Sequence, residues 1–116
     1  MEVECPLFEI SDPDNISIYL EVSDAEHRLE FNDINLSNAK LVDAHGWMVE
    51  CIPLNSDHGA LKIVGRSDKN IKTYLEKRVM AYLETHAEHF SQLLGGSIPQ
   101  HWNELVDQIR SKGIWF

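Results

Sequence analysis

Hydrophobic and polar residues alternate in the first half of the chain, a pattern typical of β-strands with one buried face. The clearest case is the segment 16–22, ISIYLEV, in which every second residue is aliphatic and Tyr19 falls among the outward positions. Residues 27–31 alternate in the same way after the polar turn 23–26. The two segments are therefore predicted to form a β-hairpin.

Four further segments of this half have the composition of strands. The first is followed by a turn that contains proline, which cannot donate a hydrogen bond to a neighbouring strand. The third is apolar on both faces except at Glu50, as expected of a central strand, and the fourth is expected to pair with it across the loop 55–59. The four segments are residues 3–10, 40–43, 47–54 and 60–64.

In the second half the hydrophobic period changes to that of helices. Apolar residues recur every three or four positions over 71–94, which predicts one long amphipathic helix that begins near Asp68 and ends at Gly95. The capping pattern of residues 97–100 then predicts a second helix, which should end near Gly113. Its apolar stripe comprises Trp102, Leu105, Val106 and Ile109.

Strands followed by helices predict an α+β fold. We expect an antiparallel β-sheet of four to six short strands with two C-terminal helices packed on one face, which leaves the other face open to solvent or to a partner. The 116 residues fit a single domain over 1–116, mainly β in residues 1–66 and mainly α in residues 67–116. Hydrophobic residues make up 43% of the chain, enough to form a core.

The cellular location of the protein is predicted from the absence of two kinds of segment. No segment approaches the ~20 consecutive apolar residues that a membrane-spanning helix needs, and the N-terminus has no basic leader, so a cytoplasmic protein is expected. Cys5 and Cys51 both lie in apolar runs and are expected to be buried thiols.

The net charge of −9 is distributed unevenly along the chain. Residues 1–58 contain thirteen acidic and two basic residues, whereas residues 59–116 contain six acidic and eight basic residues. The acidic half should repel nucleic acid and anionic membranes, because both are bound through lysine and arginine, and it should attract a basic protein. The alternative is that the acidity serves only solubility.

The predicted hairpin gathers the acidic residues that would face a basic partner. They fall on its polar side or in its turns, beside Tyr19, whose exposed ring would suit an interface. The predicted partner-binding residues are Tyr19, Glu21, Asp24, Glu26, Glu30 and Asp33.

The long helix offers a second surface. Aromatic and cationic residues follow one another at helical spacing along one of its flanks, although tyrosines at such positions otherwise only cover the core. His86 and His89 share a helical face and could bind a metal if His101 supplied a third ligand, but no HExxH motif or cysteine pair completes such a site. This helix flank comprises Tyr74, Arg78, Tyr82, His86 and His89.

No catalytic or phosphate-binding motif is recognisable, so we expect a non-enzymatic binding protein without a cofactor. The leading hypothesis is an inhibitor module, such as an immunity protein or antitoxin that neutralises a basic nuclease-type toxin. A phage-encoded inhibitor of a nucleic-acid-handling defence complex, of the anti-CRISPR kind, is an alternative. Further alternatives are an accessory or scaffold subunit that uses the helix flank, and a small metal-assisted hydrolase built on the three histidines.

The chain ends in two large aromatic residues, Trp115 and Phe116. Chain ends fray unless they are docked, so we expect this tail to pack against the protein's own core or over its sheet. Insertion into a pocket of a partner is the alternative.

Overall fold

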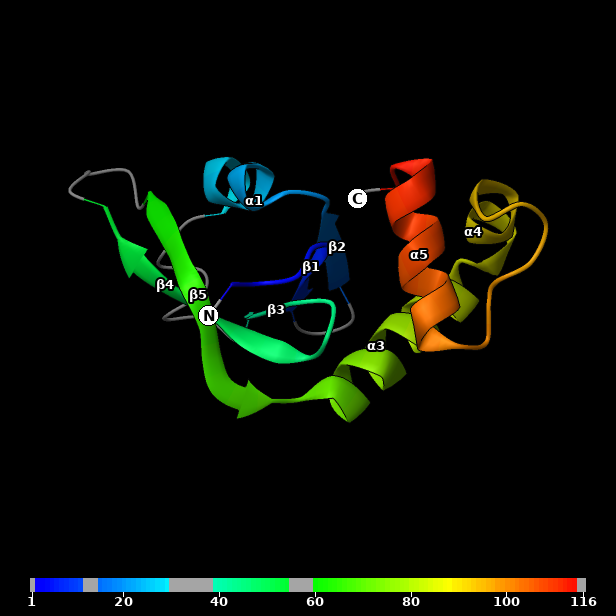
Figure 1. Cartoon of the computed structure of the whole chain (residues 1–116). Helices are drawn as coiled ribbons and strands as arrows, with labels where there is room; N and C mark the ends of the chain where they lie inside the picture. The colour runs from blue at the N-terminus through cyan, green and yellow to red at the C-terminus, as the bar shows by residue number, and fades with distance from the viewer. Residues whose placement is uncertain (1, 12–14, 30–38, 55–59, 115–116) are drawn as a thin grey trace.

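The computed structural model describes residues 2–11, 15–29, 39–54 and 60–114, and within these ranges it contains five strands and four helices (Figure 1). The strands form one antiparallel sheet in the spatial order β2-β1-β3-β4-β5. This confirms the predicted α+β fold with an N-terminal sheet and C-terminal helices. The elements are β1 (Leu7–Ser11), β2 (Asn15–Tyr19), α1 (Val22–Arg28), β3 (Lys40–Val42), β4 (Trp47–Pro53), β5 (Leu61–Asn70), α3 (Lys72–Thr85), α4 (Ala87–Leu93) and α5 (Trp102–Lys112).

The molecule is elongated, with extents of 45 × 25 × 23 Å. The β4–β5 hairpin lies at one end of the long axis and the helices α3, α4 and α5 lie at the other, as Figure 1 shows. Among the helices that the structure describes, none is both long enough and apolar enough to cross a membrane.

Helices cover both faces of the sheet. On one face, Phe8 and Ile18 belong to a core that includes side chains of α3, α4 and α5. On the other face, Leu7 and Tyr19 belong to a second core that includes Ala25 of α1. The expectation of one open face is therefore wrong where α1 lies over the sheet, because the predicted turn 23–26 and the strand ends beside it form a covering helix instead.

The predicted hairpin of residues 16–22 with 27–31 is also wrong. β2 pairs with β1, with Ile18 opposite Phe8, and the chain then enters α1. The reason lies in Val22, Ala25 and Leu29, whose three- and four-residue spacing suits a helix as well as alternation suits a strand. Ala25 and Leu29 are buried against the sheet, and this packing decides between the two patterns.

The long predicted helix is shorter and broken. β5 continues to Asn70, which pairs with Trp47, so α3 begins at Lys72 and not near residue 68. At His86 the backbone leaves helical geometry, with φ −114° and ψ 35°, and α4 begins at the next residue. Three helices therefore follow the sheet where two were predicted.

The last helix ends where predicted but begins later than the capping pattern of residues 97–100 indicated, because its N-cap is His101, which makes no side-chain capping hydrogen bond. α5 ends at Lys112, and Gly113 follows in the left-handed region at φ 64°, which glycine adopts without strain. Ile114 is buried in the helical core. The aromatic pair whose docking was predicted, residues 115–116, lies outside the described ranges.

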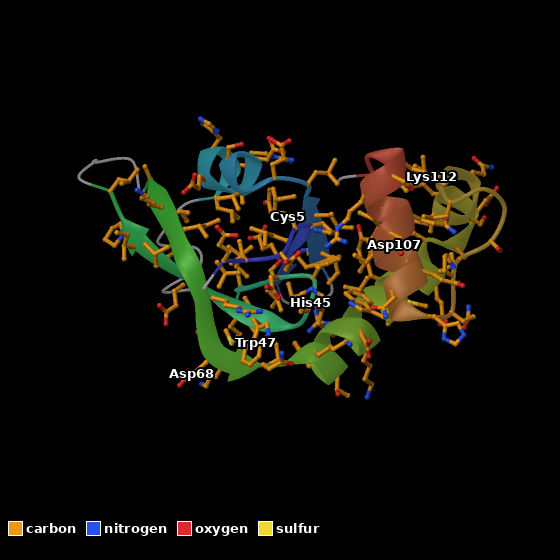
Figure 2. All side chains as sticks on the ribbon, viewed as in Figure 1. Cys5, His45, Trp47, Asp68, Asp107 and Lys112 are labelled. Atoms are coloured by element: carbon orange, nitrogen blue, oxygen red, sulfur yellow. The ribbon has the colours of Figure 1, made fainter. Side chains whose placement is uncertain are left out.

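A buried carboxylate organises the turn between β3 and β4. Asp43 is fully buried, and its Oδ1 accepts hydrogen bonds from the amides of His45 at 3.0 Å and Trp47 at 2.9 Å. Its Oδ2 accepts a third from the amide of Glu4 at 3.2 Å. Figure 2 shows His45 and Trp47 near the start of α3. The turn therefore fixes the segment before β1 as well as β4.

The same turn also forms hydrogen bonds with the C-terminal, helical half of the chain. The carbonyl of Gly46 accepts the amide of Ile71 at 2.7 Å, and the carbonyl of Ala44 accepts the indole N–H of Trp102 at 2.8 Å. Gly46 has φ +91°, and a Cβ atom there would lie 2.5 Å from Cα of Lys72. Only glycine fits this close approach of two backbone segments.

Candidate protein-binding site

Three of the acidic residues predicted for partner binding lie on α1 or at its start. Glu21 precedes the helix in an extended conformation, and Asp24 lies in its first turn, where a negative charge stabilises a helix. Both side chains are exposed, while Ala25 between them and β5 is buried. Asp24 therefore faces solvent from the helix, and Glu21 faces solvent from the residue before it.

The side chain of Glu26, unlike those of Glu21 and Asp24, is turned toward the sheet. Its Oε2 accepts a hydrogen bond from the amide of Ile63 in β5 at 2.9 Å, and its side chain is half-buried. This carboxylate satisfies a backbone donor of an edge strand, so it serves the fold and is not displayed with Glu21 and Asp24. The other two acidic residues predicted for this surface, Glu30 and Asp33, lie outside the described ranges.

Tyr19 is buried, with 4% of its surface exposed, which contradicts its predicted exposure. Its hydroxyl donates to Oε1 of Glu9 at 3.0 Å, and the guanidinium of Arg28 lies 5.3 Å from its ring centre. Burial, together with the charge and the hydrogen bond of Glu9, raises the pKa of Tyr19 to about 12. The ring is covered because α1 returns over it, which the alternation of β2 cannot reveal.

A groove of about 510 Å³ opens beside α1. Tyr19 and Leu20 contribute its apolar lining, and Asp24 and Arg28, one helical turn apart, contribute charged side chains. The groove can receive a side chain from a partner, and a basic one would meet Asp24 and the nearby Glu21. Together these residues form the α1 surface, defined here as Glu21, Asp24, Arg28 and the groove.

The helix flank divides into two clusters. In the first, Arg78 donates from Nη1 to the hydroxyl of Tyr74 at 2.6 Å, and Nζ of Lys40 lies 5.8 Å from the same ring centre. In the second, the rings of Tyr82 and His86 lie 4.7 Å apart. A hollow of about 210 Å³ joins the two clusters, and it is lined by Arg78, Ala81, Tyr82, Thr85 and His86.

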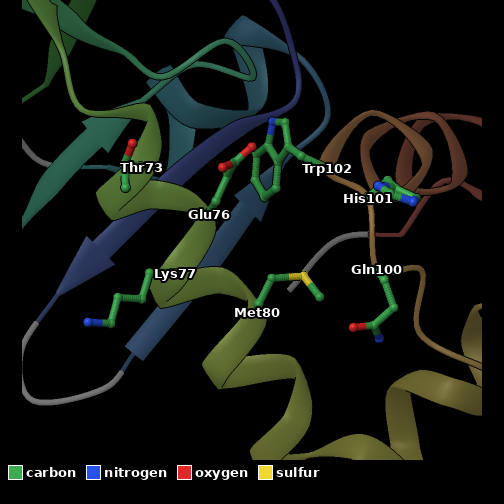
Figure 3. Close-up of a pocket in the computed structure, with 7 residues that line it drawn as sticks. All are labelled: Thr73, Glu76, Lys77, Met80, Gln100, His101 and Trp102. Atoms are coloured by element: carbon green, nitrogen blue, oxygen red, sulfur yellow. The ribbon is translucent and has the colours of Figure 1, made fainter.

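The three histidines of the metal hypothesis do not line a common pocket. His86 and His89 line a hollow at the break between α3 and α4, and His89 packs edge-on against Phe90 at 5.0 Å. His101 lines a separate pocket of about 480 Å³ between α3 and the start of α5, beside Trp102 (Figure 3). Within the described ranges, no group of three or more His, Cys, Asp or Glu side chains could hold a metal ion.

The two cysteines are free and half-buried. Burial, and to a smaller extent the charge of Glu26, raises the pKa of Cys51 to about 11. Burial also raises the pKa of Cys5. Both thiols are therefore protonated near neutral pH, and a protonated thiol is a poor nucleophile and a poor metal ligand.

The chain matches no protein-family model, no curated protein and no solved structure. Sequence reasoning predicted the exposure of Glu21 and Asp24 but missed the groove and the internal role of Glu26. The available signal was the spacing of Val22, Ala25 and Leu29, which predicts a helix with Asp24 on its outer side once it is weighed against the alternation.

Proposed function

We propose that the protein is a non-enzymatic binding protein that engages a basic protein through the α1 surface. The observation that carries the proposal is the exposure of Glu21 and Asp24 beside a groove large enough for a side chain. The net charge of −11 on residues 1–58 adds a field that steers a basic partner toward this half.

The chemistry suits an inhibitor of a nuclease-type toxin. A nuclease binds phosphates with lysine and arginine, so its substrate face is complementary to exposed carboxylates. Occupying that face excludes nucleic acid without any covalent step. An immunity protein or antitoxin would act in this way, and so would an inhibitor of a nucleic-acid-handling defence complex.

The test compares two charge-reversed variants with the same change in net charge. Glu21→Lys/Asp24→Lys alters the α1 surface, and Glu84→Lys/Glu88→Lys alters exposed positions at α3 and α4. Each protein is immobilised, exposed to lysate of its host at low salt and eluted with increasing salt. We expect a basic protein that binds the wild type and the α3–α4 variant and is lost from the α1 variant. Equal capture by both variants would contradict the proposal.

The helix flank supports a second candidate, an accessory or scaffold subunit. Its hollow is lined by Tyr82 and His86, and tyrosine and arginine are favoured at the centres of protein interfaces. Binding through such a surface tolerates high salt, because apolar burial is not screened. A partner that survives 1 M salt and is lost on Tyr82→Ala would favour this role over the α1 surface.

A further inference from the structure

The β4–β5 hairpin exposes an unusual share of the large hydrophobic side chains. Within the described ranges five are prominently exposed, and three of them lie on this hairpin or at its end: Ile52 at 46%, Leu54 at 46% and Val64 at 50%. Scattered exposed aliphatic residues need no explanation, but residues gathered on one element mark a contact surface.

These three side chains share one face. Alternation along β5 buries Leu61 and Ile63 on the side of α1 and leaves Lys62 and Val64 on the opposite side. Ile52 is the direct cross-strand partner of Lys62. The amide of Leu54 bonds the carbonyl of Ala60 at 2.9 Å, which extends the pairing beyond β4. We call Glu50, Ile52, Leu54, Lys62 and Val64 the outer hairpin face.

The outer hairpin face carries one charge of each sign. Glu50 and Lys62 are both exposed, and neither forms an ion pair with another residue that the structure describes. This face is therefore neutral in a chain whose net charge is −9. Two copies of the chain would repel each other at the acidic α1 surface. At the outer hairpin face, by contrast, each copy offers both an acid and a base to the other.

We propose that the outer hairpin face binds a second copy of the chain about a two-fold axis. Ile52 and Val64 pack on their counterparts, and Glu50 of each copy pairs with Lys62 of the other. In such an interface the same patch serves both copies, and a patch with one acid and one base satisfies this requirement of self-complementarity. The α1 surface lies on the opposite side of the hairpin, so the dimer presents two α1 surfaces outward.

Face packing is favoured over pairing of the β5 edges. The amide of Ile63 is already bonded to Glu26 of α1. The β4–β5 register also shifts between Glu50 and Cys51, and such an irregularity twists an edge away from flat pairing. The edge is thus partly occupied and irregular, whereas the outer hairpin face is open.

The small size of the face indicates a weak association. Stable dimers bury roughly 800 Å² on each partner, with about 20 or more residues a side. A core of five residues is smaller, so we expect a dissociation constant on the order of 10–100 μM. Such a dimer forms at high local concentration and dissociates on dilution.

Sedimentation equilibrium over a concentration series tests the dimer, with three charge variants of this face. Glu50→Lys places two lysines opposite each other and should weaken dimerisation at least tenfold, and Lys62→Glu should do the same with two acids. The double variant Glu50→Lys/Lys62→Glu restores the pairing and the wild-type net charge, and it should dimerise within about threefold of the wild type.

The direction of the Glu50→Lys effect separates this pairing from general repulsion. That variant lowers the negative net charge, so a contact governed by net charge alone would become stronger. Ile52→Thr/Val64→Thr should also weaken the dimer, whereas Leu93→Thr on α4, another exposed position, should not. A wild type that stays monomeric at 1 mM, or a double variant as weak as the single ones, would overturn the inference. Either result leaves the α1 surface and its partner untouched.

Discussion

The carboxylate of Glu26 accepts the backbone amide of Ile63 at 2.9 Å, and this bond ties α1 to the outermost strand of the sheet. An acid that the charge pattern had assigned to partner binding thus blocks part of an edge that would otherwise be free to pair with another chain. The same contact fixes the position from which Glu21 and Asp24 face solvent.

Removing the Glu26 carboxylate should destabilise the protein. Glu26→Ala leaves the Ile63 amide without its charged acceptor, so we expect the free energy of unfolding in urea to fall by about 1–3 kcal/mol. Glu26→Gln keeps a neutral acceptor and should lose less. Hydrogen exchange at the Ile63 amide should accelerate in Glu26→Ala. Unchanged exchange there would show that the bond does not protect the edge, and Glu21→Gln serves as the exposed control.

The buried carboxylate of Asp43 should matter more. Asp43→Ala deprives three backbone amides of their acceptor, and we expect a loss of about 3 kcal/mol or more in the free energy of unfolding. Tryptophan fluorescence during urea unfolding measures the effect. Asp68→Ala, at an exposed position of β5, should change stability by no more than about 0.5 kcal/mol. Similar effects of the two substitutions would contradict the structural role of Asp43.

Substitutions at two glycines, Gly46 and Gly96, separate backbone strain from a steric collision. Gly46 and Gly96 both have positive φ, at 91° and 115°, but only Gly46 faces the backbone of Lys72. Gly96→Ala therefore incurs backbone strain alone, about 1 kcal/mol, whereas Gly46→Ala adds a collision with a second backbone segment and should cost about 3 kcal/mol or more. Thermal unfolding of both variants measures the difference, and equal losses would exclude the collision.

Tyr19 should make the stability depend on alkaline pH. Its pKa of about 12 in the folded protein exceeds the ordinary value of 10.0, so the folded state holds the phenolic proton longer than the unfolded state does. The free energy of unfolding should therefore fall as the pH rises from about 10 to 12. Tyr19→Phe should lessen this fall, and the difference between the two proteins isolates Tyr19 from other groups such as Cys51. Parallel curves would show that the tyrosine titrates normally.

The sequence predicted those elements whose pattern permits one interpretation. Residues 47–54 and 60–64 are apolar runs joined by a polar loop, and they form β4 and the first half of β5. The stripe from Trp102 to Ile109 has helical spacing and a glycine after it, and it forms α5. In these segments local pattern and tertiary packing favour the same structure.

The failures have a common physical cause. Val22, Ala25 and Leu29 have helical spacing, but Val22 and Leu29 also fit two alternating strands with Ala25 in the turn between them, and only burial against the sheet selects the helix. Alternation tells which residues share a face of β2, but not whether a later segment covers that face, so Tyr19 was assigned to the surface. The site prediction retains Glu21 and Asp24 because exposed acids need no long-range contact to stay exposed.

The turn at Asp43 has a consequence for anyone who would shorten this protein. Its backbone carbonyls accept donors from Ile71 and Trp102, so the acidic half is bonded directly to the helical half. A fragment that stops after β5 would remove both donors and would uncover the sheet face on which α3 and α5 pack. The α1 surface is thus not a detachable peptide, and engineering it into a minimal inhibitor calls for grafting its side chains onto another scaffold.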